Sequence, residues 1–216
     1  SLYNNQDKTN YYAGNLYGNY NKSIGSHNFK VLLGGNIETY DFRNIEVQRD
    51  DLILEDLTDF NLAVGQNYVV TGGAREWKTM GVFSRINYDY DNKYLLELNG
   101  RYDGASTFPG TQRFGFFPSI SAGWNIASED FMKGTRNWLD LFKLRASYGT
   151  LGNSGLSNIN ANPYLYQQTI SARRSSIILN GVNPTVLTQP IVLPEGLTWE
   201  KATTTNVGLD VALFKN

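Results

Sequence analysis

The sequence has no cysteine, a single histidine and almost no net charge, and each shortage excludes a class of function. Without cysteine it has no disulfide framework, no cysteine metal site and no cysteine nucleophile. The one histidine, His27 in the segment "SIGSHN", cannot form a histidine metal cluster, and no serine–histidine–acid arrangement accompanies it. A formal net charge of −1 gives no electrostatic reason to bind nucleic acid. We therefore expect no catalytic residues, no metal and no cofactor, and a protein that is not an enzyme.

Long apolar runs are also missing. No stretch approaches the roughly 20 continuous apolar residues of a transmembrane helix. What the chain has instead is aromatic residues and glycine, with 14 Tyr, 11 Phe and 21 Gly, arranged in segments where every second residue is apolar. This period is typical of β-strands with two different faces. It predicts an all-β, antiparallel fold with strands near 8–22, 28–42, 77–90, 94–104, 113–127, 141–151 and 198–214.

The connections between these segments alternate in length. Compact joins, "SIGSH", "DNK" and "SEDFMKGTRNWLD", follow the first, third and fifth strands. Mostly long joins, over 43–76, 105–112 and 152–197, follow the second, fourth and sixth. Short turns on one side and long external loops on the other are typical of an up-and-down transmembrane β-barrel. Seven strands, and an opening inside patterned sequence, predict that the chain is a segment of a larger barrel.

The alternation is strong enough to set one hairpin register. Apolar and polar residues keep to separate faces over 81–90 and 94–103 if Tyr90 lies opposite Tyr94. This pairing requires a three-residue turn at 91–93, which is a common hairpin length. It also places Ile86 opposite Leu98.

The same alternation assigns residues to two faces of the sheet. A barrel wall would turn its apolar face to lipid, and we expect one exterior band formed by Ile86, Leu98, Ile120, Trp124, Leu144 and Leu209. The opposite face carries both charge signs, and we expect the following residues to face the lumen: Arg85, Glu97, Arg101, Asp103, Arg145 and Asp210. Tyr94 near one turn, with Trp77 and Tyr102 toward the other end, suggests two aromatic girdles. A soluble antiparallel sheet with one wet face has a similar pattern, so the residues alone leave both interpretations open.

Three motifs resemble one family of membrane proteins. They are "YLLELNGRYDGASTFPGTQRFGFFPSISAGWNIASEDFMK" at 94–133, "LFKLRASYGTLGN" at 141–153 and "LTWEKATTTNVGLDVALFKN" at 197–216. Their content and order resemble SusC/RagA-type TonB-dependent outer-membrane transporters of Bacteroidetes. The first half of the chain is similar only in style, through "GVFSRINYDYDNKYLL".

The resemblance implies more than the pattern does. Such transporters have a large barrel of about the plugged 22-strand type. A plug domain fills the barrel, a SusD-like surface lipoprotein covers it, and the TonB–ExbB–ExbD complex supplies energy through the plug. We expect residues 1–216 to be part of the barrel domain, with the plug absent from this chain. The implied localisation is the cell outer membrane, in contact with its lipid.

Candidate ligand residues lie near the predicted loops. Trp77 in "GGAREWK", and Phe108 and Arg113 in "GASTFPGTQRF", have rings or a guanidinium group suited to stacking on a sugar ring or holding a peptide. Loop packing explains them equally well. The acidic segment 50–59 suggests a short amphipathic helix, and its spacing does not fit an EF-hand calcium loop. Ser128 is a suitable N-cap for a short helix over 128–140.

These observations lead to two functional hypotheses. The first is TonB-dependent nutrient import across the outer membrane, with an oligosaccharide or a peptide as substrate and this chain as part of the barrel wall and external loops. The alternative is a non-transporting β-rich surface protein, such as an adhesin or binding protein. An upstream plug domain and a neighbouring gene for a lid-type lipoprotein would distinguish the first from the second.

Overall fold

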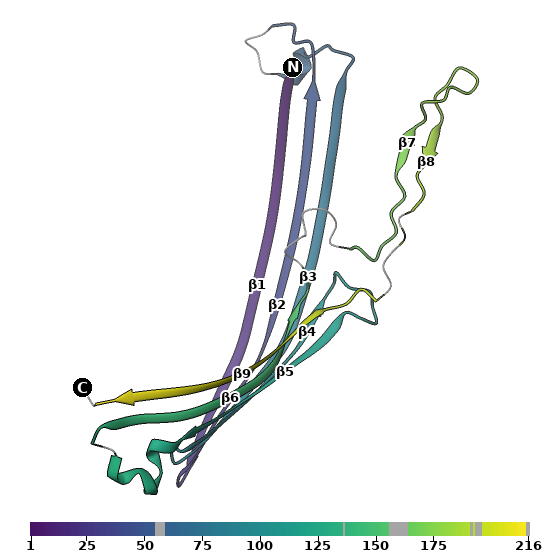
Figure 1. Cartoon of the computed structure of the whole chain (residues 1–216). Helices are drawn as coiled ribbons and strands as arrows, with labels where there is room; N and C mark the ends of the chain where they lie inside the picture. Colours follow the sequence, from purple (N-terminus) through teal and green to yellow (C-terminus); the bar gives the residue numbers. More distant parts are fainter. Residues whose placement is uncertain (55–58, 136, 156–163, 191, 193–195, 215–216) are drawn as a thin grey trace.

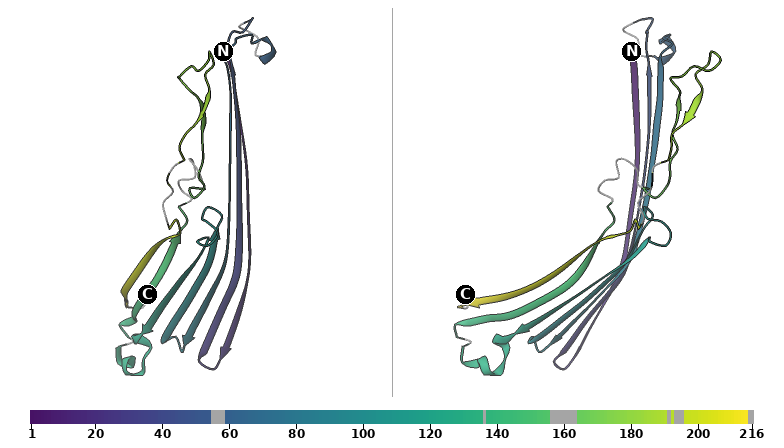
Figure 2. Two further views of the ribbon diagram at one scale, coloured as in Figure 1. Left: turned by 90° about the vertical axis from the view of Figure 1, so that its right-hand side faces the viewer. Right: turned by 45° about the vertical axis from the view of Figure 1, so that its right-hand side comes forward.

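The chain forms a long, curved antiparallel β-sheet (Figures 1 and 2). The computed structural model describes residues 1–54, 59–135, 137–155, 164–190, 192 and 196–214. Within them, seven strands pair in the order β1-β2-β3-β4-β5-β6-β9, so β1 and β9 are the edge strands of the sheet. The strands are β1 (Leu2–Ile24), β2 (His27–Arg49), β3 (Tyr68–Tyr90), β4 (Tyr94–Ala105), β5 (Phe114–Asn125), β6 (Leu139–Asn153) and β9 (Glu200–Leu213). The prediction of about seven long antiparallel strands is confirmed.

The compact turns lie at one end of the sheet and the long connections at the other (Figure 1). Ile24 pairs with His27 across a two-residue turn whose Gly25 has a φ of 58°, a backbone conformation that glycine adopts without strain. Tyr90 pairs with Tyr94, as predicted, and Asp91 and Asn92 between them also have positive φ. The Asp89 carboxylate accepts a hydrogen bond from the Asn92 backbone N–H at 3.1 Å, which closes this turn.

Two connections differ from the sequence prediction. The predicted loop 43–76 is shorter, because β2 continues to Arg49 and β3 begins at Tyr68. The prediction of an amphipathic helix is wrong at Leu52, which instead forms a β-bridge with Ala63. The 3₁₀ helix η1 (Phe60–Leu62) directly precedes Ala63. The remaining residues of the predicted helix, 55–58, lie outside the described residues. The longest connection carries a separate hairpin of β7 (Ala172–Arg174) and β8 (Thr185–Leu187), which the sequence analysis did not predict.

The join between β5 and β6 is helical, but not in the predicted way. It contains two 3₁₀ helices, η2 (Ile126–Ser128) and η3 (Asp130–Thr135), in place of one helix that begins at Ser128. Ser128 ends η2, and its hydroxyl accepts a hydrogen bond from the Asn125 side-chain amide at 2.8 Å. No helix among the described residues is long and apolar enough to cross a membrane.

A single small cluster is the only buried hydrophobic core among the described residues. It brings together Ala105, Phe108, Phe117 and Trp199, and Leu197 packs against it. The Trp199 ring contacts the rings of Phe108 and Phe117, and its indole N–H donates to the Arg113 carbonyl oxygen at 3.0 Å. The cluster therefore joins the β4–β5 loop to the start of β9, two segments far apart in sequence.

At the opposite end of the sheet from the Trp199 cluster, Glu129 connects the β5–β6 turn to neighbouring strands. One oxygen of its carboxylate accepts hydrogen bonds from the Tyr94 hydroxyl at 2.7 Å and from the Trp124 indole N–H at 2.9 Å. The Lys93 ammonium lies 3.9 Å from the other oxygen. Because these groups favour the charged carboxylate, above all the Tyr94 hydroxyl, the pKa of Glu129 is lowered from its usual value.

Replacing Trp199 by alanine should destabilise the protein by about 3–5 kcal/mol, since a large buried ring and a hydrogen bond are lost together. The measurement is reversible unfolding of the full-length protein in lipid vesicles. Trp138→Ala, which removes an indole that is 47% exposed, is the matched control and should cost much less. Equal losses for the two variants would contradict the assigned role of the cluster.

Glu129 should make stability depend on pH at the acidic side. A carboxylate whose pKa is lowered in the folded state stabilises the fold at pH values above its unfolded-state pKa. This contribution disappears as the pH falls from about 5 through the folded-state pKa. Glu129→Gln should flatten this part of the stability–pH curve, measured by urea unfolding in vesicles. Asp130→Asn, which removes the neighbouring carboxylate, should keep this acid-dependent part of the curve, because the hydrogen bonds from Tyr94 and Trp124 to Glu129 remain.

Candidate functional site

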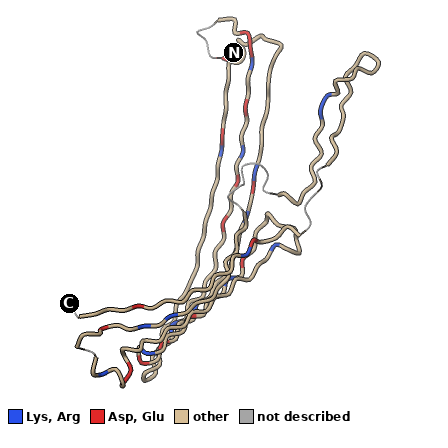
Figure 3. Tube along the Cα trace, in the orientation of Figure 1, with Lys and Arg blue, Asp and Glu red and all other residues tan. Residues whose placement is uncertain are grey.

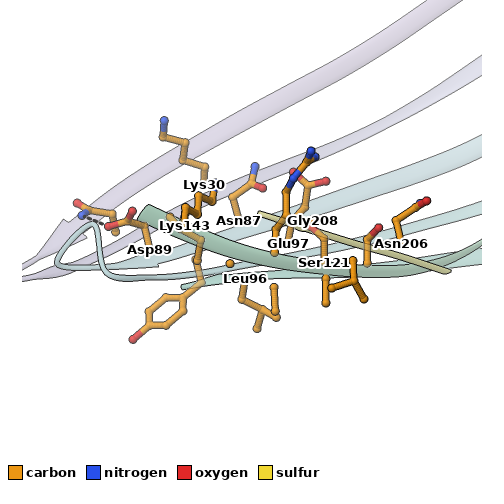
Figure 4. A pocket seen from close by; sticks show the side chains of 18 residues that line it. Lys30, Asn87, Asp89, Leu96, Glu97, Ser121, Lys143, Asn206 and Gly208 are labelled. Carbon is orange, nitrogen blue, oxygen red and sulfur yellow. Dashed lines mark hydrogen bonds between the residues drawn. The ribbon is translucent and has the colours of Figure 1, made fainter. Parts of the chain in front are cut away.

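The polar face of the sheet brings together all six side chains that the sequence assigned to it. Strand register places Arg85 opposite Asn99 and Glu97 opposite Asn87, and the same alternation continues across β5, β6 and β9. In Figure 4 the side chains of Lys30, Asn87 and Asn206 lie on one side of the sheet and that of Leu96 on the other. Charges of both signs are interleaved along the strands in Figure 3. Arg85, Glu97, Arg101, Asp103, Arg145 and Asp210 therefore share one face.

Arg85 and Glu97 are linked through an amide. The Arg85 guanidinium donates to the Asn99 side-chain oxygen at 2.7 Å, and the Asn99 amide donates to the Glu97 carboxylate at 2.8 Å. The Asn99 side chain therefore links the two opposite charges of Arg85 and Glu97.

Arg101 forms a bidentate ion pair with Asp103 on the same strand. Its Nε and Nη2 atoms donate to the two oxygens of Asp103 at 3.0 and 2.8 Å, and Nη2 also donates to the Asn36 side chain at 3.2 Å. The guanidinium carbon lies 5.3 Å from the centre of the Phe83 ring. A bidentate contact with a stacked ring restricts the arginine to one orientation.

Arg145 pairs across strands with Asp210 at 3.4 Å. The pair depends on Gly208, which lies opposite Arg145: a Cβ built there would fall 2.7 Å from the arginine Nε. The absence of a side chain at Gly208 therefore leaves space for the Arg145 guanidinium. Within the described residues, Lys30 and Lys143 on this face have no ion-pair partner, so the face presents both neutralised pairs and free ammonium groups.

Two hollows lie along the polar face. One, of about 690 Å³, is lined by Lys30, Asp89 and Lys143 near the compact turns (Figure 4). The other, of about 830 Å³, is lined by Arg85, Arg101 and their neighbours farther along the strands. These volumes are in the range of small-molecule sites. The mixed charges and amides lining them suit hydrogen bonding with polar solutes.

The three predicted ligand residues do not lie together. The Trp77 side chain is 9% exposed and packs on the polar face against the rings of Tyr40, its cross-strand partner, and of Tyr11 on the strand beyond. This position shows that placing Trp77 in an outward aromatic girdle was wrong. Phe108 is 5% exposed within the Trp199 cluster, and Arg113 contributes its backbone carbonyl there. Ligand contact by Trp77, Phe108 and Arg113 stays a prediction.

The apolar face is solvent-exposed in this structure rather than packed into a core. The six residues of the predicted exterior band are all exposed, and they fall into continuous cross-strand rows. One row, next to the compact turns, runs through Tyr90, Tyr94, Trp124, Leu144 and Leu209. A contiguous apolar surface of this size marks contact with a membrane or another protein.

Aromatic rings border this apolar face at two levels. Tyr94 stacks between Tyr90 and Trp124 at one level, and Tyr102 stacks on Phe114 at the other. Tyr94 and Tyr102 are eight residues apart, about 27 Å along the strand at roughly 3.4 Å per residue. A strand tilt of about 40° reduces this to about 20 Å along the normal, near the roughly 25 Å apolar band of known membrane barrels.

Strands β1 to β3 continue past the second aromatic level. Beyond Ile37 and Met80, their formerly apolar face carries charged side chains, and Lys78 pairs there with Glu76 at 2.7 Å. Each of these strands has 23 residues, against 12 in β4 and β5. Such a change from apolar to charged residues along one face is typical of a boundary between hydrocarbon and water.

His27 and the acidic residues form no metal site in the described part of the chain. His27 Nδ1 lies 2.9 Å from the Tyr88 hydroxyl, and its ring packs on Tyr90. No group of three or more histidine, cysteine or acidic side chains with metal-binding geometry occurs among the described residues. Glu55 and Asp56 of the acidic segment lie outside them.

Comparison with known proteins identifies similar sequences over the whole chain. A family described as "TonB dependent receptor-like, beta-barrel" matches residues 1–216. "TonB-dependent receptor P3" of Formosa agariphila is 33% identical over 201 residues, covering 93% of this chain and 19% of that protein. "TonB-dependent receptor SusC" of Bacteroides thetaiotaomicron is 30% identical over 197 residues, covering 91% and 19%. The chain therefore spans about a fifth of the length of these curated relatives.

Solved structures with the same fold include one described as "Structure of the RagAB peptide transporter". The TM-score is 0.78, with 21% sequence identity over 98% of this chain and 22% of that one. At this identity the similarity establishes the fold alone.

An arginine placed on the apolar face should cost far more than one placed on the polar face. Ile120→Arg should destabilise the full-length protein by about 2–4 kcal/mol in lipid vesicles, the cost of a cation in mid-bilayer. Its neighbour Ser121 lies on the other face, opposite Glu97. Ser121→Arg is therefore the matched control and should cost much less; equal costs would mean that the faces are misassigned.

Proposed function

Because the chain belongs to the TonB-dependent receptor-like β-barrel family, we propose that it is part of the barrel wall of an outer-membrane transporter that imports nutrients. Membership of a receptor family also agrees with the expectation that the chain is not an enzyme. The single observation that carries the proposal is the division of one sheet into two faces. The apolar face, bordered by aromatic rings, contacts lipid, and the polar face with its paired charges lines the lumen.

The lumen-facing residues Arg85, Glu97, Arg101, Asp103, Arg145 and Asp210 act through hydrogen bonding and charge, not through covalent chemistry. Arg101 and Asp103 neutralise each other, as do Arg145 and Asp210, while Lys30 and Lys143 add ammonium groups, so a polar solute passes a wall of mixed charge. A balanced wall of this kind suits an uncharged oligosaccharide or a zwitterionic peptide. It retains neither strongly, which favours passage over tight binding.

The proposed partners follow from the family. A plug domain outside these residues fills the lumen and receives energy from the TonB–ExbB–ExbD complex, and a SusD-like surface lipoprotein covers the external loops. The long connections at one end of the sheet, including the β7–β8 hairpin, are the parts of this chain that such a lid would contact. Trp77, Phe108 and Arg113 lie toward the same end and remain the proposed ligand residues.

Deletion of the full-length gene tests this function. Uptake of fluorescent oligosaccharides and of fluorescent oligopeptides is compared in the parent, the deletion strain and a strain without TonB. We expect one substrate class to be lost in both mutants, because import needs the barrel and the energy source together. Surface attachment that is lost on deletion but kept without TonB, with uptake intact, would instead support the adhesin alternative.

A further inference from the structure

The tripeptide Leu–Asn–Gly occurs twice in the chain, in two different structural surroundings. One copy places Asn180 and Gly181 at the tip of the β7–β8 hairpin, and the other places Asn99 and Gly100 inside β4. An asparagine before glycine is prone to lose its side-chain amide, because glycine has no side chain to hinder attack by its own backbone nitrogen. Since the two copies share this local sequence, a difference in their reactivity must come from the structure.

Asn180 and Gly181 are the central residues of a two-residue hairpin turn. Both have positive φ, 52° and 78°, and the backbones of Leu179 and Val182 exchange hydrogen bonds of 3.0 and 3.1 Å beside them. Asn–Gly favours this geometry. Pairing in such a turn uses only the outer two residues, and the Gly181 N–H donates no hydrogen bond among the described residues. No hydrogen bond of the turn therefore restrains the nitrogen that would attack Asn180.

The turn is weakly connected to the rest of the hairpin. The Leu179–Val182 pair is an isolated bridge, which residues 175–178 and 183–184 separate from the three-residue strands β7 and β8. Asn180 and Gly181 are exposed, and the hairpin is not part of the seven-stranded sheet (Figure 1). A short, exposed pairing of this kind opens locally at low cost, so the Asn180 side chain can rotate toward the Gly181 nitrogen.

Asn99 is restrained by both its backbone and its side chain. It lies in β4, with β3 paired on one side and β5 on the other. Its side-chain oxygen accepts a hydrogen bond from Arg85 at 2.7 Å, and its side-chain nitrogen donates one to Glu97 at 2.8 Å. Attack on this amide would require the loss of both hydrogen bonds and of the strand pairing. The sheet therefore protects Asn99.

We propose that Asn180 is a site of spontaneous deamidation in the folded protein. The Gly181 nitrogen bonds to the side-chain carbonyl carbon of Asn180, and the side-chain nitrogen leaves as ammonia with the proton that Gly181 loses. Water then opens the resulting succinimide ring at one carbonyl or the other, which gives aspartate or isoaspartate. The reaction consumes only water, and the proposal does not depend on the proposed transport function.

Deamidation would change the chemistry of the hairpin tip. Residues 175–190 carry no charged side chain, and Ile177, Ile178, Leu179 and Val182 are exposed among them. The reaction places a carboxylate in this uncharged, apolar segment. Isoaspartate also adds an atom to the backbone, which disrupts the pairing of Leu179 with Val182. Contacts of the tip with an apolar surface would therefore weaken as the protein ages.

Peptide mass spectrometry of the full-length protein tests the proposal. The protein is incubated in lipid vesicles at neutral and at mildly alkaline pH and digested, and the conversion of amide to acid is followed at Asn180 and Asn99. We expect severalfold faster conversion at Asn180, and a higher rate at alkaline pH because the attacking nitrogen must lose its proton. In urea-unfolded protein the two sites should react at similar rates, since only the structure distinguishes them.

Two controls lie on the same hairpin. Asn183 precedes Pro184, whose nitrogen has no proton to lose, so Asn183 should keep its amide. Asn180→Gln replaces the reactive residue by one whose larger ring closes much more slowly, and this variant should keep the amide at position 180. Methyl labelling by a purified isoaspartyl methyltransferase should increase with time in the parent protein and stay at background in Asn180→Gln.

Two results would overturn the proposal. Asn180 that stays as intact as Asn99 in the folded protein, but reacts in urea, would mean that the turn or a covering part of the protein restrains its side chain. Equally fast conversion of both residues in the folded protein would mean that the sheet does not protect Asn99 and that the structure selects neither site.

Discussion

Every feature of this wall depends on the register of the backbone hydrogen bonds between its strands. Since side chains alternate with a period of two, a slip of one residue in any pair would exchange the two faces of that strand. Such a slip at β4 would turn Glu97 and Arg101 to the apolar face and Leu98 to the polar face. In the proposed barrel wall the hydrophobic effect acts through the bilayer rather than through a core, and the cost of a wrong register is the cost of charge in hydrocarbon. The paired charges of the polar face and the apolar rows are two results of this one constraint.

Strand register does not fix the positions of the connections between strands. Specific side-chain contacts do this. Glu129 binds the hydroxyl of Tyr94 and the indole of Trp124, so the 3₁₀ turn after β5 is attached to the neighbouring hairpin. At the other end, Trp199 ties the loop after β4 to the start of β9. Both joints use an aromatic residue with a polar group, which packs on one side and donates a hydrogen bond on the other.

Alternation in the sequence predicted the sheet, the Tyr90–Tyr94 hairpin and the residues of both faces, because period-two patterning and face assignment are the same physical fact. It underestimated β2 and β3, since beyond Ile37 and Met80 charged residues such as Arg43 and Lys78 interrupt the apolar face and weaken the contrast that reveals a strand. The helix at Ser128 was placed from capping preference, which long-range contacts of Glu129 override. The cluster around Trp199 was missed because Trp199 lies more than 80 residues from Ala105, Phe108 and Phe117. Only the contact between the "LTWEK" and "TFPGTQRFGFF" segments in three dimensions brings these residues together.

The unequal strand lengths give this wall a stepped rim. At about 3.3 Å per residue, β1 to β3 measure about 75 Å and β4 and β5 about 40 Å. The taller strands extend beyond the short pair, which ends close to the level of Tyr102. In the proposed barrel these taller strands would stand in water on one flank of the mouth. A solute would then reach this part of the mouth from the side of the short strands, so strand length would restrict the direction of entry before any side chain makes contact.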